Sequence, residues 1–391
     1  MFVSAKVMTS VSFRSMSGIF EIFSICIELE RNTPSYSSGM LWVKKIGYYH
    51  LNQTKVIADD WILVLDESIG IGQEKLLVIL GVRSSQVDFN RPLRIQDMEP
   101  IIVKSKKKWT GEDVFEELEK SKALLGKVVY ATTDGSSVLK KALRLSEINH
   151  TYDVTHAMAI MLEKLYKKDV NFIELTKLMG EMRLKLCCSK HAHIIPPNQR
   201  SKSRFLNIDI LTDWGMKVLV TLEKDNLTKE EKELLQWVGN KKSFIEEMSQ
   251  IIGIIEELSI LLKNNGLSNK TKIKCSQMLK KCKKTQRQNY FKCLFTEYLN
   301  TNSALIGKQL KTLVCTSDIV ETTFGKYKNE LSKNPMNGIT DLALIIPALT
   351  SNLLDDEIKK AIDSCTCKML NEWKIENLCD SLSAKRKIAL N

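Results

Sequence analysis

The sequence is poor in the residues that interrupt helices. Its 391 residues include only 7 prolines and 17 glycines, whereas a sandwich of many short strands needs frequent turn residues. We therefore expect a helix-rich globular chain. Hydrophobic residues make up 43% of the sequence, which is enough for a sizeable core and excludes wholesale disorder. The length predicts two or three domains.

Features of membrane, secreted and zinc-finger proteins are also missing. The most apolar early stretch, residues 18–28, is too short to span a membrane and carries acids. It lacks the basic start and cleavage site of a signal peptide. The ten cysteines follow no disulfide framework, so we expect reduced thiols and a cytoplasmic protein. Cys187 and Cys188 precede His191 and His193, but no second ligand pair follows at finger-like spacing, which speaks against zinc.

Positive charge is in excess. The 58 Lys and Arg residues exceed the 46 Asp and Glu residues by 12, and the pI is about 9.1. Such a balance fits the phosphate backbone of nucleic acid, although a basic protein with no such role remains an alternative. Basic residues cluster at Lys104–Lys108, at Arg200, Lys202 and Arg204, at Lys280–Lys284, and at Lys326 and Lys328. Such runs are usually solvated faces, but phosphate contacts from them would position DNA without reading its sequence.

The pattern along the chain divides it into five parts. Residues 1–58 look helical, 59–155 alternate between apolar strands and helices, and 156–316 look almost entirely helical. Residues 317–350 return to a capped helix and an apolar stretch, and 351–391 form a helical tail. We interpret 59–155 and 317–350 as two parts of one α/β core that is interrupted by a large helical insertion.

The N-terminal segment has one pattern with two interpretations. A Ser-rich start precedes Trp42, and Gly47 stands where a helix would end. This arrangement is typical of the second helix of a helix-turn-helix. An ordinary amphipathic helix fits the same residues equally well.

Residues 59–155 predict a mixed sheet flanked by helices. Residues 61–65 and 76–82 are apolar runs separated by a glycine-containing turn, as in a hairpin. A third strand is expected within 93–103, a fourth at 128–133 and a short fifth at 152–154, with helices at 114–125 and from 137 to about 145.

Three acids stand at places where such a fold could bind metal. Asp66 ends the first strand, Asp134 ends the fourth strand, and Glu321 lies near the start of a late helix. Each also has a purely structural interpretation. Asp66 would simply point into solvent, Asp134 would cap a helix, and Glu321 would form a capping box with Asp318.

The functional interpretation links the three acids. In open sheets, ligands bind at the carboxyl ends of strands, so neighbouring strands would bring Asp66 and Asp134 together. Three carboxylates including Glu321 could hold two metal ions about 3.5–4 Å apart, as in-line phosphoryl transfer requires. Hard oxygen ligands favour two Mg²⁺ or Mn²⁺ ions over zinc. Asp60 and Glu67 lie close enough to Asp66 to be alternatives for the first acid.

At these residues the sequence resembles bacterial insertion-sequence transposases of the acidic-triad (DDE) type, which have a ribonuclease-H-like catalytic domain. The resemblance runs over residues 30–350 and rests on the order and spacing of several segments. These are WILVLDES around Asp66, VVYATTDGSSVLKKAL around Asp134, YDVTH at 152–156, residues 200–207 with Trp214, TSDIVETTFGKYK around Glu321, and residues 337–350.

The resemblance implies metal-dependent strand cleavage and strand transfer at the ends of a mobile element. Asp66, Asp134 and Glu321 would be the catalytic and metal-binding residues. Asp153 and His156 would lie near that site. The implied partner is double-stranded DNA, both element ends and target, bound by a homo-oligomer associated with the nucleoid. No membrane and no nucleotide cofactor are implied.

Two other functions fit the same sequence. A nuclease on the same core would cut DNA without joining it, and a remnant of an inactive element would bind DNA without catalysis. Such transposases usually carry more helical DNA-binding sequence before residue 34, so we expect a chain truncated at its N-terminus.

Overall fold

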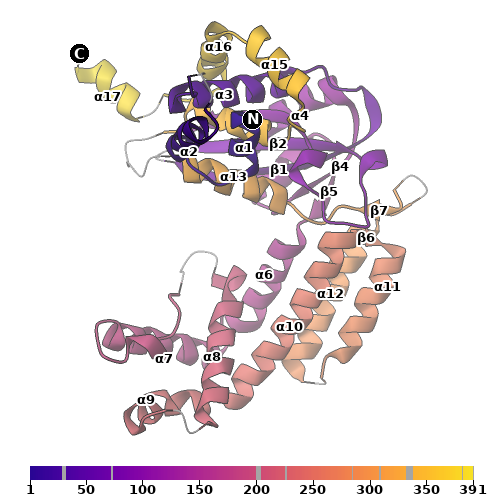
Figure 1. The fold of residues 1–391 in the computed structure, drawn as a ribbon. Helices are drawn as coiled ribbons and strands as arrows, with labels where there is room; N and C mark the ends of the chain where they lie inside the picture. The colour runs from indigo at the N-terminus through magenta and orange to yellow at the C-terminus, as the bar shows by residue number, and fades with distance from the viewer. Residues whose placement is uncertain are drawn as a thin grey trace. The chain divides into compact units, whose positions relative to one another are not determined.

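The structure is a computed structural model, and it describes residues 1–28, 32–71, 74–199, 204–224, 227–283, 285–307, 310–331, 338–380 and 382–390. The chain folds into two compact units (Figure 1). The first comprises Met1–Thr151 and Thr316–Asn391, and the second comprises Tyr152–Cys315. Residues 1–58 and 351–391, which the sequence pattern sets apart, therefore belong to the same unit as the sheet.

The first unit contains a five-stranded sheet with helices on both faces. Its strands are β1 (Ala58–Ile71), β2 (Glu74–Arg83), β3 (Glu99–Lys106), β4 (Gly126–Thr133) and β5 (Asn149–Tyr152). Its helices are α1 (Phe2–Met8), α2 (Phe13–Cys26), α3 (Tyr36–Asn52), α4 (Gly111–Leu125), α5 (Ser137–Leu145), α13 (Asp318–Glu330), α14 (Ile345–Leu349), α15 (Asp355–Ser364), α16 (Cys367–Asn377) and α17 (Leu382–Leu390).

The strand order is β3-β2-β1-β4-β5. β1 is antiparallel to β2, β2 is antiparallel to β3, and β4 is parallel to β1. This is the ribonuclease-H-like α/β arrangement, so the predicted fold class is confirmed. The predicted hairpin and fourth strand lie where expected, whereas β3 begins later and β5 earlier than predicted.

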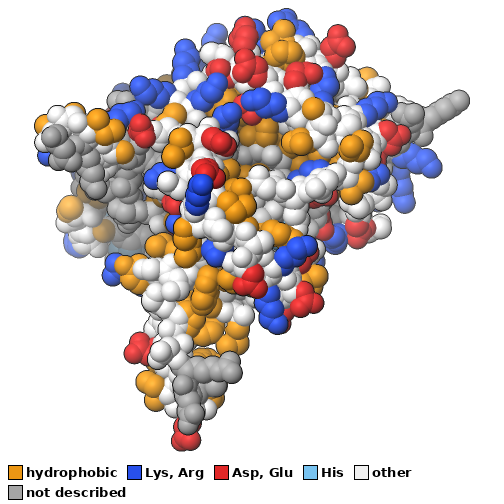
Figure 2. All heavy atoms as spheres, turned by 90° about the horizontal axis from the view of Figure 1, so that it is seen from above, with side chains coloured by type: hydrophobic (Ala, Val, Ile, Leu, Met, Phe, Trp, Pro, Cys, Tyr) orange, Lys and Arg blue, Asp and Glu red, His pale blue; other side chains and the backbone are white. Residues whose placement is uncertain are grey.

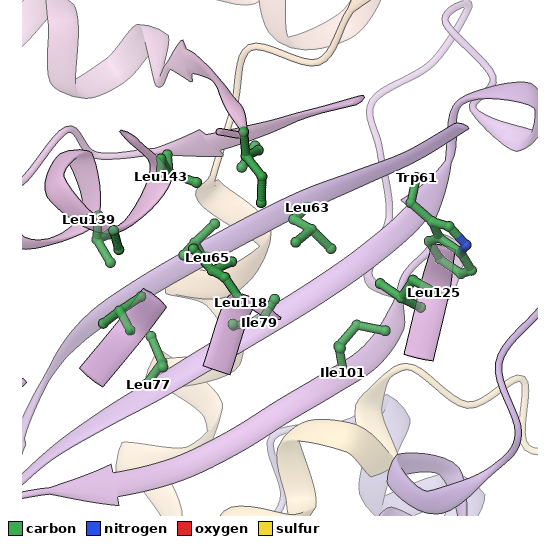
Figure 3. Packing of buried hydrophobic residues seen from close by; sticks show 14 of the residues in the cluster. Trp61, Leu63, Leu65, Leu77, Ile79, Ile101, Leu118, Leu125, Leu139 and Leu143 are labelled. Atoms are coloured by element: carbon green, nitrogen blue, oxygen red, sulfur yellow. The ribbon is translucent and has the colours of Figure 1, made fainter. Parts of the chain in front are cut away.

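One face of the sheet packs against α4 and α5 (Figure 3). Because side chains alternate along a strand, Trp61, Leu63 and Leu65 of β1 point to this face, where they meet Leu118 of α4 and Leu139 of α5. As predicted, α4 ends at Leu125, and Gly126 follows as its C-cap with a φ of 89° that suits glycine. Its N-terminus carries a capping box between Thr110 and Asp113.

The opposite face is covered by helices from both ends of the chain. α3 packs against α14 and β3, and α13 packs against β1. The prediction that Gly47 ends a helix is wrong, because α3 continues to Asn52. A Cβ atom at Gly47 would lie 1.8 Å from the carbonyl oxygen of Leu344. This glycine therefore permits a close crossing, and the face of α3 that carries it is buried in the core rather than presented to DNA.

The C-terminal helices contact this core. α15 packs against α3, and α16 packs against α3 and β3. After α16, the amide of Cys379 donates a hydrogen bond of 2.8 Å to the hydroxyl of Ser105 on β3. The tail therefore lies along the edge strand of the sheet.

The second unit is a helical bundle, as the sequence predicts for this stretch. Its helices are α6 (Val154–Tyr166), α7 (Val170–Leu186), α8 (Ile208–Leu222), α9 (Lys229–Gly239), α10 (Lys242–Asn265), α11 (Asn269–Met278) and α12 (Gln286–Ser303), with a short ribbon of β6 (Leu267–Ser268) and β7 (Thr312–Leu313). The 24-residue α10 contacts α6, α8 and α11. Among the described residues, no helix is long and apolar enough to cross a membrane.

Candidate active site at the carboxyl ends of β1 and β4

The pairing of β1 with β4 brings two of the predicted acids to one edge of the sheet. Val64 is the register partner of Thr132 in this parallel pair. Asp66 and Asp134 each lie two residues further along their chains, so they are neighbours at the carboxyl ends of the two strands. Asp66 is buried, with 4% of its surface exposed. Alternation places its side chain on the face opposite Leu65, so the side chain does not simply point into solvent.

A hydrogen-bonded turn holds Asp134. Its Oδ1 accepts a hydrogen bond of 2.8 Å from the amide of Ser136, and the amide of Gly135 donates to the hydroxyl of Thr133 at 3.0 Å. Gly135 has a φ of 79°, which the turn requires and glycine tolerates. The Oδ2 atom of Asp134 has no hydrogen-bond partner among the described residues, so it is available to a ligand.

His150 supports the same turn from β5. Its Nε2 lies 2.9 Å from the hydroxyl of Thr133. Burial lowers the pKa of His150 to about 4, with a further decrease from the charge of Lys140, while the charge of Asp134 opposes the shift. The imidazole is therefore neutral at pH 7 and adds no positive charge beside Asp134.

The helix-cap interpretation of Asp134 is wrong. Ser136 is the N-cap of α5, and its hydroxyl accepts a hydrogen bond from the amide of Leu139 at 3.3 Å. Asp134 lies two residues earlier and only shapes the turn. Helix capping therefore does not account for an acid at this position.

Asp318 is also not the N-cap that the capping-box interpretation of Glu321 assumes. α13 begins at Asp318, with Ser317 as its N-cap and no side-chain cap hydrogen bond. The amide of Asp318 instead donates to the hydroxyl of Thr316 at 3.2 Å. Glu321 is an exposed residue of the first turn.

α13 covers the face of the sheet to which Asp66 points. It contacts β1, and its buried Ile319, Val320 and Phe324 are absent from the cluster that α4 and α5 form on the other face. The following segment lies on the same side, since the amide of Ile339 donates to Glu74 of β2 at 3.1 Å. All three predicted acids therefore belong to one unit, and the helix that carries Glu321 packs on the face that carries Asp66.

The three acids are not gathered into a preformed metal cluster. In the part of the chain that the structure describes, no three His, Cys, Asp or Glu side chains lie close enough together to hold a metal ion. The chemistry of the oxygen donors suits Mg²⁺ or Mn²⁺.

Asp60, one of the two alternatives to Asp66, makes other contacts. It pairs with Arg83, and its Oδ2 accepts a hydrogen bond of 2.9 Å from the amide of Ser85. These contacts lie at the start of β1, away from its carboxyl end.

Glu67 is the other alternative, and its environment is unusual. Only 6% of its surface is exposed, it lies in a bulge of β1, and its Oε2 has no hydrogen-bond partner among the described residues. Burial raises its pKa, and the negative charge of Asp134 adds to the rise, while Lys75 opposes it. A second acid directly after Asp66 was the only sequence signal for this buried carboxylate.

Asp153 and His156 lie in the second unit. Asp153 is fully buried and caps α6, since its Oδ1 accepts a hydrogen bond of 2.8 Å from the amide of His156. This contact gives both residues a structural role. Their placement near the catalytic acids stays a prediction.

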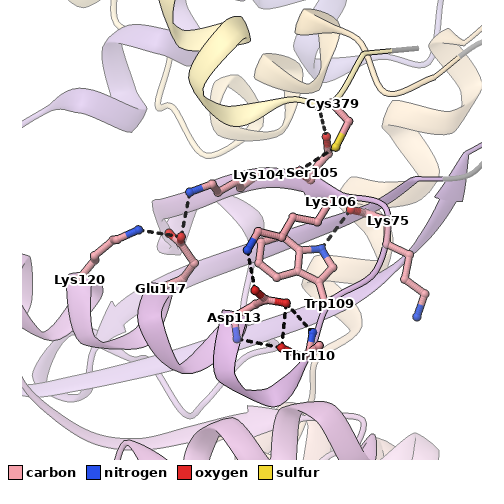
Figure 4. Close-up of polar contacts among 10 residues, drawn as sticks. All are labelled: Lys75, Lys104, Ser105, Lys106, Trp109, Thr110, Asp113, Glu117, Lys120 and Cys379. Atoms are coloured by element: carbon pink, nitrogen blue, oxygen red, sulfur yellow. Dashed lines mark hydrogen bonds and ion pairs between the residues drawn. The ribbon is translucent and has the colours of Figure 1, made fainter. Parts of the chain in front are cut away.

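The predicted DNA-binding residues fall into three groups. Arg200 and Lys202 lie outside the described residues, as does the side chain of Arg204. On α13, Lys328 is exposed and follows Glu321 by seven residues, so both lie on one helix face, whereas Lys326 is half-buried on another. Figure 4 shows that Lys104 and Lys106 pair with acids of α4 instead, at 2.8 Å to Glu117 and 2.7 Å to Asp113.

Comparisons with known proteins add evidence from solved structures. No protein-family model matches the sequence, and no curated protein matches it. Among solved structures, the chain is similar to the Drosophila P element transposase strand transfer complex, with a TM-score of 0.44 and 9% sequence identity over 91% of this chain and 92% of that chain. A likeness at this level identifies no function, and none of the comparisons supports the narrower expectation of a bacterial insertion-sequence family.

Proposed function

We propose that this protein is a DNA transposase that cuts and joins strands at the ends of a mobile element, with Asp66, Asp134 and Glu321 as metal-binding catalytic residues. The observation that carries the proposal is the parallel register of β1 and β4, which makes Asp66 and Asp134 neighbours at one edge of the sheet. The packing of α13 against β1 supports Glu321 as the third member.

The contribution of each residue follows from its surroundings. The turn around Asp134 uses Oδ1 and leaves Oδ2 for a ligand. Asp66 brings a carboxylate that is fixed by the strand and largely removed from water. Divalent metal ions, when bound, would activate a water or a 3′-hydroxyl nucleophile and stabilise the leaving oxygen. Lys328 on the exposed face of α13 is suited to contact a phosphate of the bound strand.

The test uses labelled duplexes taken from the DNA that flanks the gene, incubated with Mg²⁺, Mn²⁺ or EDTA. We expect a shortened cleavage product and a longer joined product, both dependent on metal. Asp66→Asn, Asp134→Asn and Glu321→Gln should each abolish both products while DNA binding persists. Asp318→Asn is the matched control, because it removes an acid from the same helix turn as Glu321.

The outcomes separate transposition from the two rival functions. Cleavage without a joined product would identify a nuclease. DNA binding with no metal-dependent product from the unsubstituted chain would identify a non-catalytic remnant. Full activity in any one of the three variants would remove that residue from the catalytic set.

A further inference from the structure

The helical unit holds a cavity that α6, α8 and α10 line together. Its volume is about 300 Å³, which lies at the lower end of the range for small-molecule sites. The three helices belong to one compact unit, in which α10 contacts both α6 and α8. None of the described lining residues belongs to the proposed catalytic set. The cavity is therefore a candidate site with a role of its own.

The floor of the cavity is apolar. Met158 and Leu162 of α6 line it and are buried, as is Ile255 of α10. Met158 and Leu162 are four residues apart, so they lie on one face of the helix. Phe205 forms a wall, and its ring stacks on that of Phe172 from α7 at 5.7 Å. Apolar side chains that line a cavity lose packing contacts on that side, so this floor favours a ligand with an apolar body.

Two acids also line the cavity, and both lack a partner. Asp209 of α8 and Glu256 of α10 form no ion pair or side-chain hydrogen bond with any described residue. By contrast, the next residue of α10, Glu257, pairs with Lys281 at 2.8 Å. Among the described lining residues, Lys263 is the only cation. The acids therefore leave an excess of negative charge at the cavity.

This excess is opposite in sign to the charge of the whole chain, which is +12. On the face drawn in Figure 2, acids are interspersed with Lys and Arg side chains. At the cavity, the two acids instead lie beside an apolar floor. Charges interact more strongly where apolar groups exclude water. The cavity therefore favours a cation, and it disfavours a phosphate or a carboxylate.

We propose that this cavity binds a small amphipathic amine. The apolar body of the amine lies on the floor between α6 and α10, where it displaces water from apolar side chains. Its ammonium group lies beside Asp209 and Glu256, whose carboxylates accept charge-assisted hydrogen bonds from it. Such a ligand matches both the apolar lining and the unpaired acids of the cavity.

The site does not depend on DNA or on the catalytic assignment, so it can be tested separately from the proposed function. The measurement is a titration of the DNA-free full chain at pH 7, followed through the methyl NMR signals of Met158 and Ile255. The probes are phenylbutylamine, phenylbutanol and phenylbutyrate, which share an apolar body and differ in charge. We expect the amine to bind about tenfold more tightly than the alcohol. The carboxylate should bind most weakly.

Substitutions test which residues cause this preference. Asp209→Asn combined with Glu256→Gln should make the amine bind no more tightly than the alcohol, with the affinity for the alcohol unchanged. Glu257→Gln is the matched control, because it removes an acid of α10 that does not line the cavity, and it should keep the preference. Ala159→Phe, at a lining position of α6, should weaken the binding of all three probes by filling the space.

Three results would each overturn the proposal. The first is equal affinity of the three probes for the unsubstituted chain. The second is an undiminished preference for the amine in the double variant, or an equal loss of that preference in Glu257→Gln. The third is a titration in which none of the probes changes the two methyl signals.

Discussion

The carboxylate of Asp134 accepts a hydrogen bond from the amide of Ser136 at 2.8 Å, and Ser136 in turn caps helix α5. Two residues that are two positions apart therefore have different roles. Ser136 stabilises the helix, whereas Asp134 stands before it with one oxygen used by the turn. The two roles can therefore be separated by substitution.

The first prediction concerns this division. Ser136→Ala should lower the free energy of unfolding by about 1 kcal/mol through loss of the cap, while metal-dependent cleavage persists in the folded fraction. Asp134→Asn should change stability little, because an amide oxygen can accept the same hydrogen bond, but it should abolish cleavage. Thermal unfolding and the cleavage assay measure the two effects. Loss of cleavage in Ser136→Ala together with retained cleavage in Asp134→Asn would contradict the catalytic role of Asp134.

The second prediction concerns Glu67. Its raised pKa means that the folded chain binds its proton more tightly than the unfolded chain does, so its charge opposes folding above the unfolded pKa. Glu67→Gln should therefore increase the melting temperature at pH 8 in metal-free buffer, and the gain should shrink as the pH falls towards 4. Glu116→Gln, at an exposed position of α4, is the control, with little change expected at either pH. A lower melting temperature for Glu67→Gln at pH 8 would contradict the prediction.

Local sequence signals predicted the elements that hold the site. The hairpin and the fourth strand follow from apolar runs, and these signals act within a few positions. The helix from Asp318 was also predicted, although its N-cap is Ser317 and not the predicted Asp318. The exact role of a polar residue was harder to predict. Asp134 and Ser136 are both favourable N-cap residues, and only the backbone path selects Ser136. The placement of Glu321 likewise depends on packing between α13 and β1, which are far apart in the sequence.

Helix α3 shows even more clearly that long-range packing cannot be predicted from local sequence. The pattern around Trp42 fitted either a helix of a helix-turn-helix or an ordinary amphipathic helix, and Gly47 was expected to end it because a glycine after an apolar run usually ends a helix. The structure instead buries Gly47 against Leu344, about three hundred residues away in sequence. No local pattern distinguishes a glycine that ends a helix from one that permits a close helix crossing.

The third prediction concerns phosphate contacts. Lys328→Gln should reduce the dependence of DNA affinity on salt, since each lost phosphate contact lowers the log–log slope by about one. Lys326→Gln is the matched control, because Lys326 lies on a different face of α13. Replacing Arg200, Lys202 and Arg204 by Ala together should reduce the slope further. Fluorescence anisotropy over a range of salt concentrations gives the slopes, and equal slopes for all variants would exclude these contacts.

The fourth prediction concerns acid sensitivity. Burial lowers the pKa of His50 to about 4, with a further decrease from Lys55, and its Nε2 has no hydrogen-bond partner among the described residues. Between pH 6.5 and 4 the unfolded chain binds a proton that the folded chain does not, so stability falls as the pH falls. His50 can contribute up to about 3 kcal/mol of that loss. His50→Phe should flatten the stability profile between pH 7 and 4.5 in urea unfolding, and an unchanged profile would show that His50 is not the cause.

The last prediction uses two glycines inside helices to test the core beneath the sheet. Gly47 of α3 lies so close to the backbone of Leu344 that a Cβ atom would be 1.8 Å from its carbonyl oxygen, whereas a Cβ atom at Gly180 of α7 would meet nothing within 4 Å. Alanine favours a helix over glycine by about 1 kcal/mol in both places. Gly180→Ala should therefore stabilise the chain slightly. Gly47→Ala should destabilise it by about 2–3 kcal/mol, because backbone atoms cannot rotate away as a side chain can and α3 must separate from the segment that carries Leu344. Urea unfolding of the two variants measures both signs. A stabilising Gly47→Ala would mean that α3 is not packed in this core, and the helix would again be available to contact DNA.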